Sequence, residues 1–175
     1  MLGAQFEARW AMIWRAPLQT EWLQAGAGGS TTVDVGALYL SRNGNNPVAA
    51  NASWTIDLTA YASARFRIGR LPMMCAFYRA TLPVGGMMFA PDYGQLYYEI
   101  YMGDHRGILT GAYWGRYFRL DQQLALDIKL GKQWLRIGYG VDLVSTKVND
   151  IVSRRVNHTL IFGITTGRLW GNKVK

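Results

Sequence analysis

The alternation of apolar and polar residues is unbroken from residue 50 to residue 68. Every even position in this segment is apolar, and every odd position is polar except Tyr61, which is amphipathic. A period of two predicts an extended strand, because successive side chains of a strand point to opposite faces of a sheet. On a helix the same residues would scatter their apolar groups around every side and leave no face to bury.

This predicted strand is longer than a membrane crossing requires. At about 3.3 Å per residue it could extend roughly 60 Å, whereas a tilted strand crosses a bilayer with about 9 to 11 residues. Nowhere does the chain approach the roughly 18 consecutive apolar residues of a membrane-spanning helix. We therefore expect strands to make any membrane crossing, and the leading hypothesis is a transmembrane β-barrel.

Similar patterns predict seven principal strands in all. They cover residues 3–15, 18–27 with an irregular continuation to residue 40, 50–68, 73–82, 119–130, 135–143 and 156–169. The expected connections are short at residues 16–18, 69–72 and 131–132, and long at residues 41–49, 83–118 and 145–155. Tight turns on one rim and extended loops on the other are typical of outer-membrane barrels.

An odd number of strands is unusual, because single-chain bacterial barrels normally have an even number. We therefore expect an all-β, antiparallel up-and-down transmembrane β-barrel of about eight strands, with one strand ahead of Met1. The segment Met1–Glu7 also lacks the basic start and apolar core of a signal peptide. Residues 1–175 are thus predicted to form a single β-barrel domain that lacks its signal peptide and first strand.

Large aromatic residues lie close to the expected short turns and to the end of the chain. We predict that Trp14, Phe66, Trp134 and Trp170 form an aromatic girdle at the membrane interface. Trp134 fits this role less well than the others, because it lies on the polar face of its strand.

Charged residues make up 17% of the chain, which is low beside the roughly 25% of ordinary soluble domains. On the polar faces of the predicted strands, arginines alternate with acids among small hydroxyl, amide and glycine residues. About eight strands leave an interior just wide enough for side chains, so we expect a polar lumen packed by ion pairs. The predicted lumen-lining charged residues are Glu7, Arg9, Asp57, Arg65, Arg67, Asp127, Lys129, Arg136 and Asp142.

Two other kinds of barrel fit parts of the pattern. The charged residues could line the pore of a small-solute channel, although the narrow diameter favours a packed interior. A soluble, lipocalin-like ligand-binding barrel would show the same alternation with its sidedness reversed, so periodicity alone does not distinguish it. The loop asymmetry, the aromatic rim and the low charge content favour the membrane barrel, with a structural or binding role.

The net charge of +8 raises the question of an acidic partner. The arginines are dispersed among separate strand patterns and form no contiguous basic stripe, so we expect no nucleic-acid binding. The chain has one cysteine, Cys75, so no disulfide framework forms within it. The expected partners are outer-membrane lipid and the barrel assembly machinery, with the oligomeric state left open.

Candidate catalytic residues are few. Ser153, His158 and either Asp142 or Asp150 could be drawn as the triad of a lipid-modifying barrel enzyme. A lipid A deacylase-like barrel is expected to carry His-x-Ser, and this chain has no serine two residues after His158. No spacing of His, Cys or carboxylates predicts a metal site. We therefore expect no enzymatic activity, no metal and no cofactor.

The wide connection at residues 83–118 carries apolar side chains where a loop is expected. Met87, Met88, Phe89 and Tyr93 would form a loop surface that is costly in water unless it folds back or meets a partner. We expect this surface to cap the mouth of the barrel, and a binding surface for a lipid, a glycan or a protein stays open.

Several stretches resemble a known family. They are Asn45-Asn46-Pro47 and residues 88–95, 97–100, 122–128 and 146–149. The chain is similar over most of its length to uncharacterised outer-membrane barrel proteins from Bacteroides and relatives, classed as a domain of unknown function. The resemblance implies a porin-like β-barrel in the outer membrane of a Gram-negative bacterium, and no catalytic residues come with it. Relative to that pattern, the N-terminal signal and first strand are missing from this chain.

Overall fold

The computed structural model describes residues 2–17, 20, 22–39, 48–90, 101–103, 108–148 and 151–166. Its strands are β1 (Leu2–Arg15), β2 (Leu23–Tyr39), β3 (Val48–Phe66), β4 (Met74–Phe89), β5 (Leu109–Gly111), β6 (Tyr117–Leu130), β7 (Gln133–Val148) and β8 (Ile151–Thr166). Among the described residues, no helix is long and apolar enough to cross a membrane.

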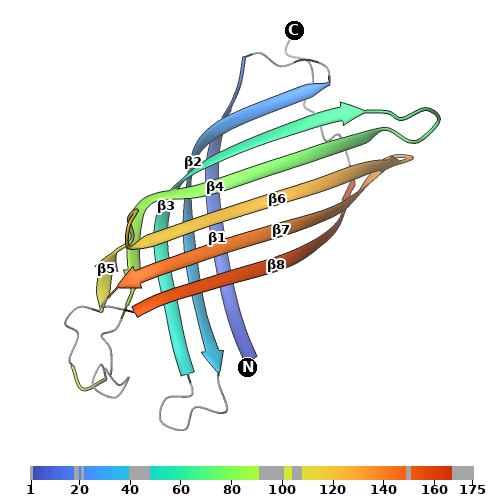
Figure 1. Cartoon of the computed structure of the whole chain (residues 1–175). Coiled ribbons are helices and arrows are strands. Elements are labelled where there is room, and N and C mark those ends of the chain that lie inside the picture. The colour runs from blue at the N-terminus through green and yellow to red at the C-terminus, as the bar shows by residue number, and fades with distance from the viewer. Residues whose placement is uncertain are drawn as a thin grey trace.

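The seven long strands form one antiparallel sheet in the order β1-β2-β3-β4-β6-β7-β8, and the short β5 pairs with β4 beside this path. Each long strand is hydrogen-bonded to the next one along the chain, which is an up-and-down arrangement. The sheet curls, and the start of β1 and the end of β8 lie at opposite ends of it (Figure 1). The predicted all-β, up-and-down architecture is confirmed.

The two faces of the sheet differ in polarity. On β3, Thr55, Asp57 and Thr59 are 1–3% exposed, whereas Ile56 and Leu58 between them are 53% and 58% exposed. Side chains of distant strands meet only on the inner side of a curled sheet, and ion pairs between β1 and β6 place the polar side chains there. We call the polar side the concave face and the apolar side the convex face.

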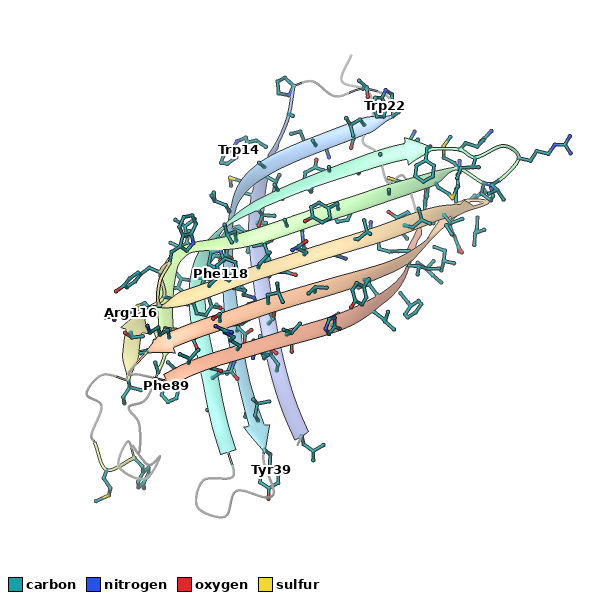
Figure 2. The ribbon with its side chains drawn as sticks, viewed as in Figure 1. Trp14, Trp22, Tyr39, Phe89, Arg116 and Phe118 are labelled. Carbon is teal, nitrogen blue, oxygen red and sulfur yellow. The ribbon has the colours of Figure 1, made fainter. Side chains whose placement is uncertain are left out.

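Large aromatic side chains lie near both ends of the sheet. Figure 2 shows Trp14 and Trp22 toward one end, and Tyr39 and Phe89 toward the other. Trp14 and Trp22 flank the β1–β2 connection, while Tyr39 and Phe89 end β2 and β4.

β4 is longer than the sequence pattern predicts, because it continues through Pro83 to Phe89. The register with β3 shifts there: Asp57 lies opposite Pro83, and Ile56 lies opposite Gly85. This β-bulge accommodates a proline, which has no N–H to donate to a regular ladder. The predicted strand end at Pro83 was therefore wrong.

Two other predicted boundaries also differ. β2 runs regularly from Leu23 to Tyr39, where we expected an earlier start and an irregular continuation. β7 and β8 pair as far as Val148 and Ile151, so the long connection predicted at residues 145–155 is in fact a tight one. Polar residues on both faces of these strand ends obscured their alternation. One of the three predicted long connections is therefore absent.

A small apolar cluster lies toward one end of the concave face. Met88, Ala112 and Tyr117 are buried against one another, with Val144 and Val148 packed beside them. Ala112 follows β5, and its N–H donates to the carbonyl oxygen of Gly86 at 2.9 Å. The segment that follows β5 thus folds back on the sheet at this point.

Candidate functional site

The concave face carries one connected set of charged and polar side chains, to which every long strand contributes. We call this set the central charge network. Its members are Glu7 and Arg9 on β1, Thr32 and Asp34 on β2, Asp57 on β3, Arg79 on β4, Arg119 and Asp121 on β6, Asp142 on β7 and Arg155 on β8.

Arg119 lies at the centre of this network and is 5% exposed. Its Nε and Nη2 donate to the two oxygens of Asp142 at 2.7 and 3.0 Å. Nη1 donates to Asp34 at 3.4 Å, and Nη2 also contacts Glu7. A planar guanidinium is suited to this role, because its fixed fork of donors can bind a carboxylate at two points and reach others.

Arg9 forms a second branching point. Its guanidinium contacts Glu7 at 3.0 Å and also pairs with Asp121 on β6. Its Nε donates to the hydroxyl of Thr32 at 3.1 Å, and that hydroxyl donates to Asp57 at 2.6 Å. The buried Asp57 is therefore joined to the network through a hydroxyl relay.

Two further arginines extend the network to the remaining strands. Arg79 on β4 lies 3.5 Å from Asp121, and Arg155 on β8 lies 3.6 Å from Asp34. Within the ion pairs, four arginines face four carboxylates. Such balance is expected where charges leave water, because an isolated buried ion is strongly destabilising.

A separate ion pair lies nearer the β6–β7 turn. Arg136 donates to both oxygens of Asp127 at 2.7 and 2.8 Å, and Asp127 is buried. The guanidinium carbon of Arg136 also lies 5.1 Å from the ring centroid of Phe77, within the range of a cation–π contact. This pair fixes the facing side chains of β6 and β7.

Hydroxyl groups join three neighbouring strands on the same face. The hydroxyls of Ser30 and Thr59 lie 2.7 Å apart, and those of Thr59 and Thr81 lie 3.1 Å apart. All three residues are buried. The concave face is therefore filled by mutually bonded polar groups.

The residues predicted to line the lumen divide into three groups. Glu7, Arg9, Asp57 and Asp142 belong to the central charge network, and Asp127 and Arg136 form the separate pair. Arg65 is half-buried near the end of β3, whereas Arg67 and Lys129 are exposed near the ends of β3 and β6. Among the described residues, Arg67 and Lys129 join neither the central charge network nor the pair of Asp127 and Arg136.

Sequence reasoning missed five charged members of the network as site residues, namely Asp34, Arg79, Arg119, Asp121 and Arg155, and also the hydroxyl residue Thr32. Arg119 and Asp121 carried a usable signal, because they occupy odd positions on the polar face of a clearly alternating strand. Asp34 and Arg155 carried no such signal. Asp34 lies in the stretch that we expected to be irregular, and Arg155 lies in the loop expected at residues 145–155.

Several residues predicted for the aromatic girdle and the loop surface lie elsewhere in the structure. Trp14 and Phe66 are exposed on the convex face, but Trp134 is 6% exposed and shares the concave face with Arg136, so its girdle assignment was wrong. Met87, Met88 and Phe89 belong to β4 and not to a loop, and Met88 is buried. Trp170 and Tyr93 lie outside the described residues.

The serine–histidine group considered for catalysis does not assemble. Ser153 and His158 lie five positions apart on β8, so their side chains point to opposite faces of the sheet. His158 instead meets Tyr139 on the convex side, with its Nδ1 2.5 Å from the tyrosine oxygen. Asp150 lies outside the described residues. Within the described part of the chain, no group of His, Cys, Asp or Glu is arranged to hold a metal ion.

The family model described as "Protein of unknown function (DUF3316)" matches residues 2–169. Comparisons with curated proteins and with solved structures gave no match.

Proposed function

The chain belongs to the DUF3316 family of proteins of unknown function, and we propose that it acts as an integral β-barrel protein of the bacterial outer membrane. One observation carries this proposal: the polar residues of the sheet are buried on its concave face, while the large apolar residues are exposed on its convex face. In a water-soluble barrel the arrangement is the reverse, with apolar side chains inside.

The exposed apolar surface extends over the whole sheet. Trp10 on β1, Leu124 on β6 and Phe162 on β8 are 78%, 59% and 72% exposed. Each Å² of such surface costs about 25 cal/mol in water, and apolar patches larger than a few hundred Å² mark an interaction surface. Acyl chains would cover this surface on every strand at once, which a single protein partner would not.

The length of the apolar band on β3 fits a bilayer. Its outward positions are apolar from Trp54 to Phe66, with an aromatic residue at each end. Twelve steps of about 3.3 Å give roughly 40 Å, which a strand tilt of about 45° reduces to roughly the 30 Å of a hydrocarbon core. The aromatic residues would then lie near the two membrane–water interfaces.

The concave face favours a structural role for this barrel. Its charges are bonded to one another and its hydroxyls form chains, so the interior resembles a packed plug more than an open channel. In this proposal the partners are outer-membrane lipid and, during insertion, the barrel assembly machinery. The proposal includes no nucleic acid, cofactor or reaction.

Fractionation and gel migration test this proposal. The chain would be expressed behind a cleavable signal peptide in a Gram-negative host, and the membranes would be washed with urea. We expect the protein to remain in the outer-membrane fraction, to need detergent for extraction, and to migrate differently on a gel before and after boiling. A monodisperse monomer in the soluble fraction without detergent would refute the proposal.

A further inference from the structure

Three exposed cations lie on neighbouring strands at one end of the sheet. They are Arg116 just ahead of β6, Lys147 on β7 and Arg154 on β8, and we call them the basic rim. The N–H of Lys147 donates to the carbonyl oxygen of Arg116 at 2.7 Å, and the next pair along is Tyr117 with Thr146, so Lys147 lies opposite Arg116. Arg154 is the register partner of Ser145, two positions from Lys147 along β7.

The basic rim lies on the convex side of the sheet. Side chains alternate along β8, so Arg154 shares a face with Val156 and Leu160, which are 53% and 70% exposed. Lys147 lies opposite Val152, which is 57% exposed. The cations therefore belong to the face that carries the exposed apolar residues.

The apolar surface begins directly beside these cations. The next row of register partners that contains Val156 also contains Leu120 and Leu143, so it is apolar on all three strands. Figure 2 shows Arg116 and Phe118 toward the same end of the sheet. A molecule that binds the basic rim and covers this surface needs a negative charge next to an apolar body.

The acids of the described part of the chain leave this charge unbalanced. All of them face the concave side, namely Glu7, Asp34, Asp57, Asp121, Asp127 and Asp142. None of these carboxylates pairs with the basic rim. Like charges that lie directly opposite each other in a ladder are destabilising, as Arg116 and Lys147 do here. An anion bound between them would remove this repulsion.

The guanidinium of Arg116 is held in place with most of its donors free. Its Nη1 donates to the hydroxyl of Thr110 at 3.3 Å, and its central carbon lies 5.4 Å from the ring centroid of Tyr113. The remaining N–H groups can bind two oxygens of one phosphate, while a lysine adds a point charge. Tyr113 and Trp114 are 48% and 59% exposed, as expected of aromatic residues at a membrane–water interface.

The spacing of the three cations suits a single phosphate group. Opposite residues of neighbouring strands have Cβ atoms about 5 Å apart, and diagonal neighbours are about 7–8 Å apart. Long arginine and lysine side chains at such positions reach a common anion.

The basic rim also lies at the end of the sheet from which the longer connections leave. β2 and β4 end there, and the segments that follow them are residues 40–47 and 90–108. In outer-membrane barrels the longer loops face the outside of the cell. The basic rim would then lie at the level of the headgroups of the outer leaflet.

We propose that the basic rim binds the phosphate of a phosphorylated glycolipid of the lipid A type, whose acyl chains lie on the neighbouring apolar surface. This inference rests on the proposed membrane location. The apolar surface beside the cations favours a lipid phosphate over a free one.

Native mass spectrometry of the whole chain in detergent tests the proposal, with diphosphoryl lipid A as the probe. The same lipid after removal of its phosphates is the matched ligand. We expect the protein to retain the phosphorylated form and to release the other. The double variant Lys147→Gln, Arg154→Gln should bind diphosphoryl lipid A roughly 30-fold more weakly, because each cation near a charged lipid surface contributes about fivefold. Arg116→Gln should weaken binding in the same direction.

The control variant is Arg70→Gln, Lys132→Gln, which removes the same charge from exposed turns at the opposite end of the sheet. It should bind lipid A as the unaltered protein does. Equal weakening in both double variants would show attraction by net charge alone and overturn the proposal. Retention of the dephosphorylated lipid would overturn it too, and displacement of lipid A by a large excess of inorganic phosphate would show a free-anion site.

The urea wash and the gel shift on boiling report insertion and folding of each variant separately. A protein that inserts and shifts but does not retain lipid A would refute the lipid site and leave the proposed function standing. A protein that fails the wash and the shift would refute the proposed function itself.

Discussion

Arg119 on β6 and Glu7 on β1 form an ion pair although β2, β3 and β4 lie between their strands in the sheet. The contact is possible only because the sheet curls far enough for side chains of β1 and β6 to meet across its concave face. Arg119 also holds Asp34 and Asp142, so a single guanidinium joins β1, β2, β6 and β7. We infer that this residue stabilises the curl of the sheet.

Removing the Arg119 guanidinium should strongly destabilise the folded protein. In Arg119→Met, Glu7, Asp34 and Asp142 lose a buried cationic partner, and breaking a buried ion pair from one side costs about 3–5 kcal/mol. Urea unfolding of protein reconstituted in lipid vesicles, followed by tryptophan fluorescence, measures the change. Arg116→Met is the matched control, because Arg116 is exposed and its side chain contacts Thr110 and Tyr113, which lie outside the network. Equal stability of the two variants would contradict the central role of Arg119.

Two adjacent glycines of β2 should respond oppositely to the same substitution. A Cβ at Gly28 would lie 2.0 Å from the carbonyl oxygen of Met12, whereas a Cβ at Gly29 would meet nothing within 4 Å. Gly28→Ala must therefore separate the β1 and β2 backbones, and we expect a loss of about 1–3 kcal/mol. Gly29→Ala should be neutral or slightly stabilising, because alanine restricts the unfolded chain. The same unfolding assay compares them, and an unchanged Gly28→Ala variant would contradict the close packing of these strands.

The ion pair of Asp127 and Arg136 should be energetically coupled. It is bidentate and Asp127 is buried, so the single variants Asp127→Asn and Arg136→Gln should each destabilise the protein. A double-mutant cycle should give a coupling energy of about 0.5–3 kcal/mol. Combining Asp127→Asn with Arg119→Met should be nearly additive, because among the described residues Asp127 pairs with Arg136, whereas Arg119 pairs with Glu7, Asp34 and Asp142. Absence of coupling within the pair would show that the contact does not form in the folded protein.

The packed concave face predicts that the protein does not conduct ions. Purified protein added to planar bilayers should give no steady single-channel steps, because in the proposed barrel the mutually bonded side chains of the concave face would occupy the narrow interior. Arg67 is exposed near the end of β3 and provides a test of any conductance that is seen. Steady steps whose ion selectivity changes in Arg67→Ala would support the channel alternative and contradict the packed interior.

Strand positions followed from the sequence because the two faces of this sheet differ so strongly in polarity. Residues 50–68 alternate throughout, with the amphipathic Tyr61 as the one departure, and β3 covers nearly the same segment. Beyond the β-bulge the alternation no longer predicts which side chains of β4 face the concave side, because one extra residue near Pro83 reverses their direction. A bulge depends on the partner strand, so the alternation of β4 alone does not reveal it.

The concave network was only partly predictable for a related reason. Alternation assigns a residue to a face, and it placed Glu7, Arg9 and Asp57 correctly on the concave side. It does not say which charges meet, because that depends on the register of strands distant in sequence. Arg155 was not predicted as a member of the network, because the pairing of β7 with β8 extends into a polar stretch that was expected to be a loop.

Spin labels on single cysteines measure most directly whether the convex face contacts lipid. In reconstituted Cys75→Ala protein, labels would replace Leu58, Leu124 and Phe162 on the convex face. Labels at Arg70 and Lys132, in the exposed turns, serve as controls. We predict that the convex labels collide readily with oxygen, which concentrates in hydrocarbon, and rarely with a water-soluble nickel chelate, while the turn labels do the reverse. Nickel accessibility at the convex positions equal to that at the turns would contradict the membrane-facing assignment of the apolar face.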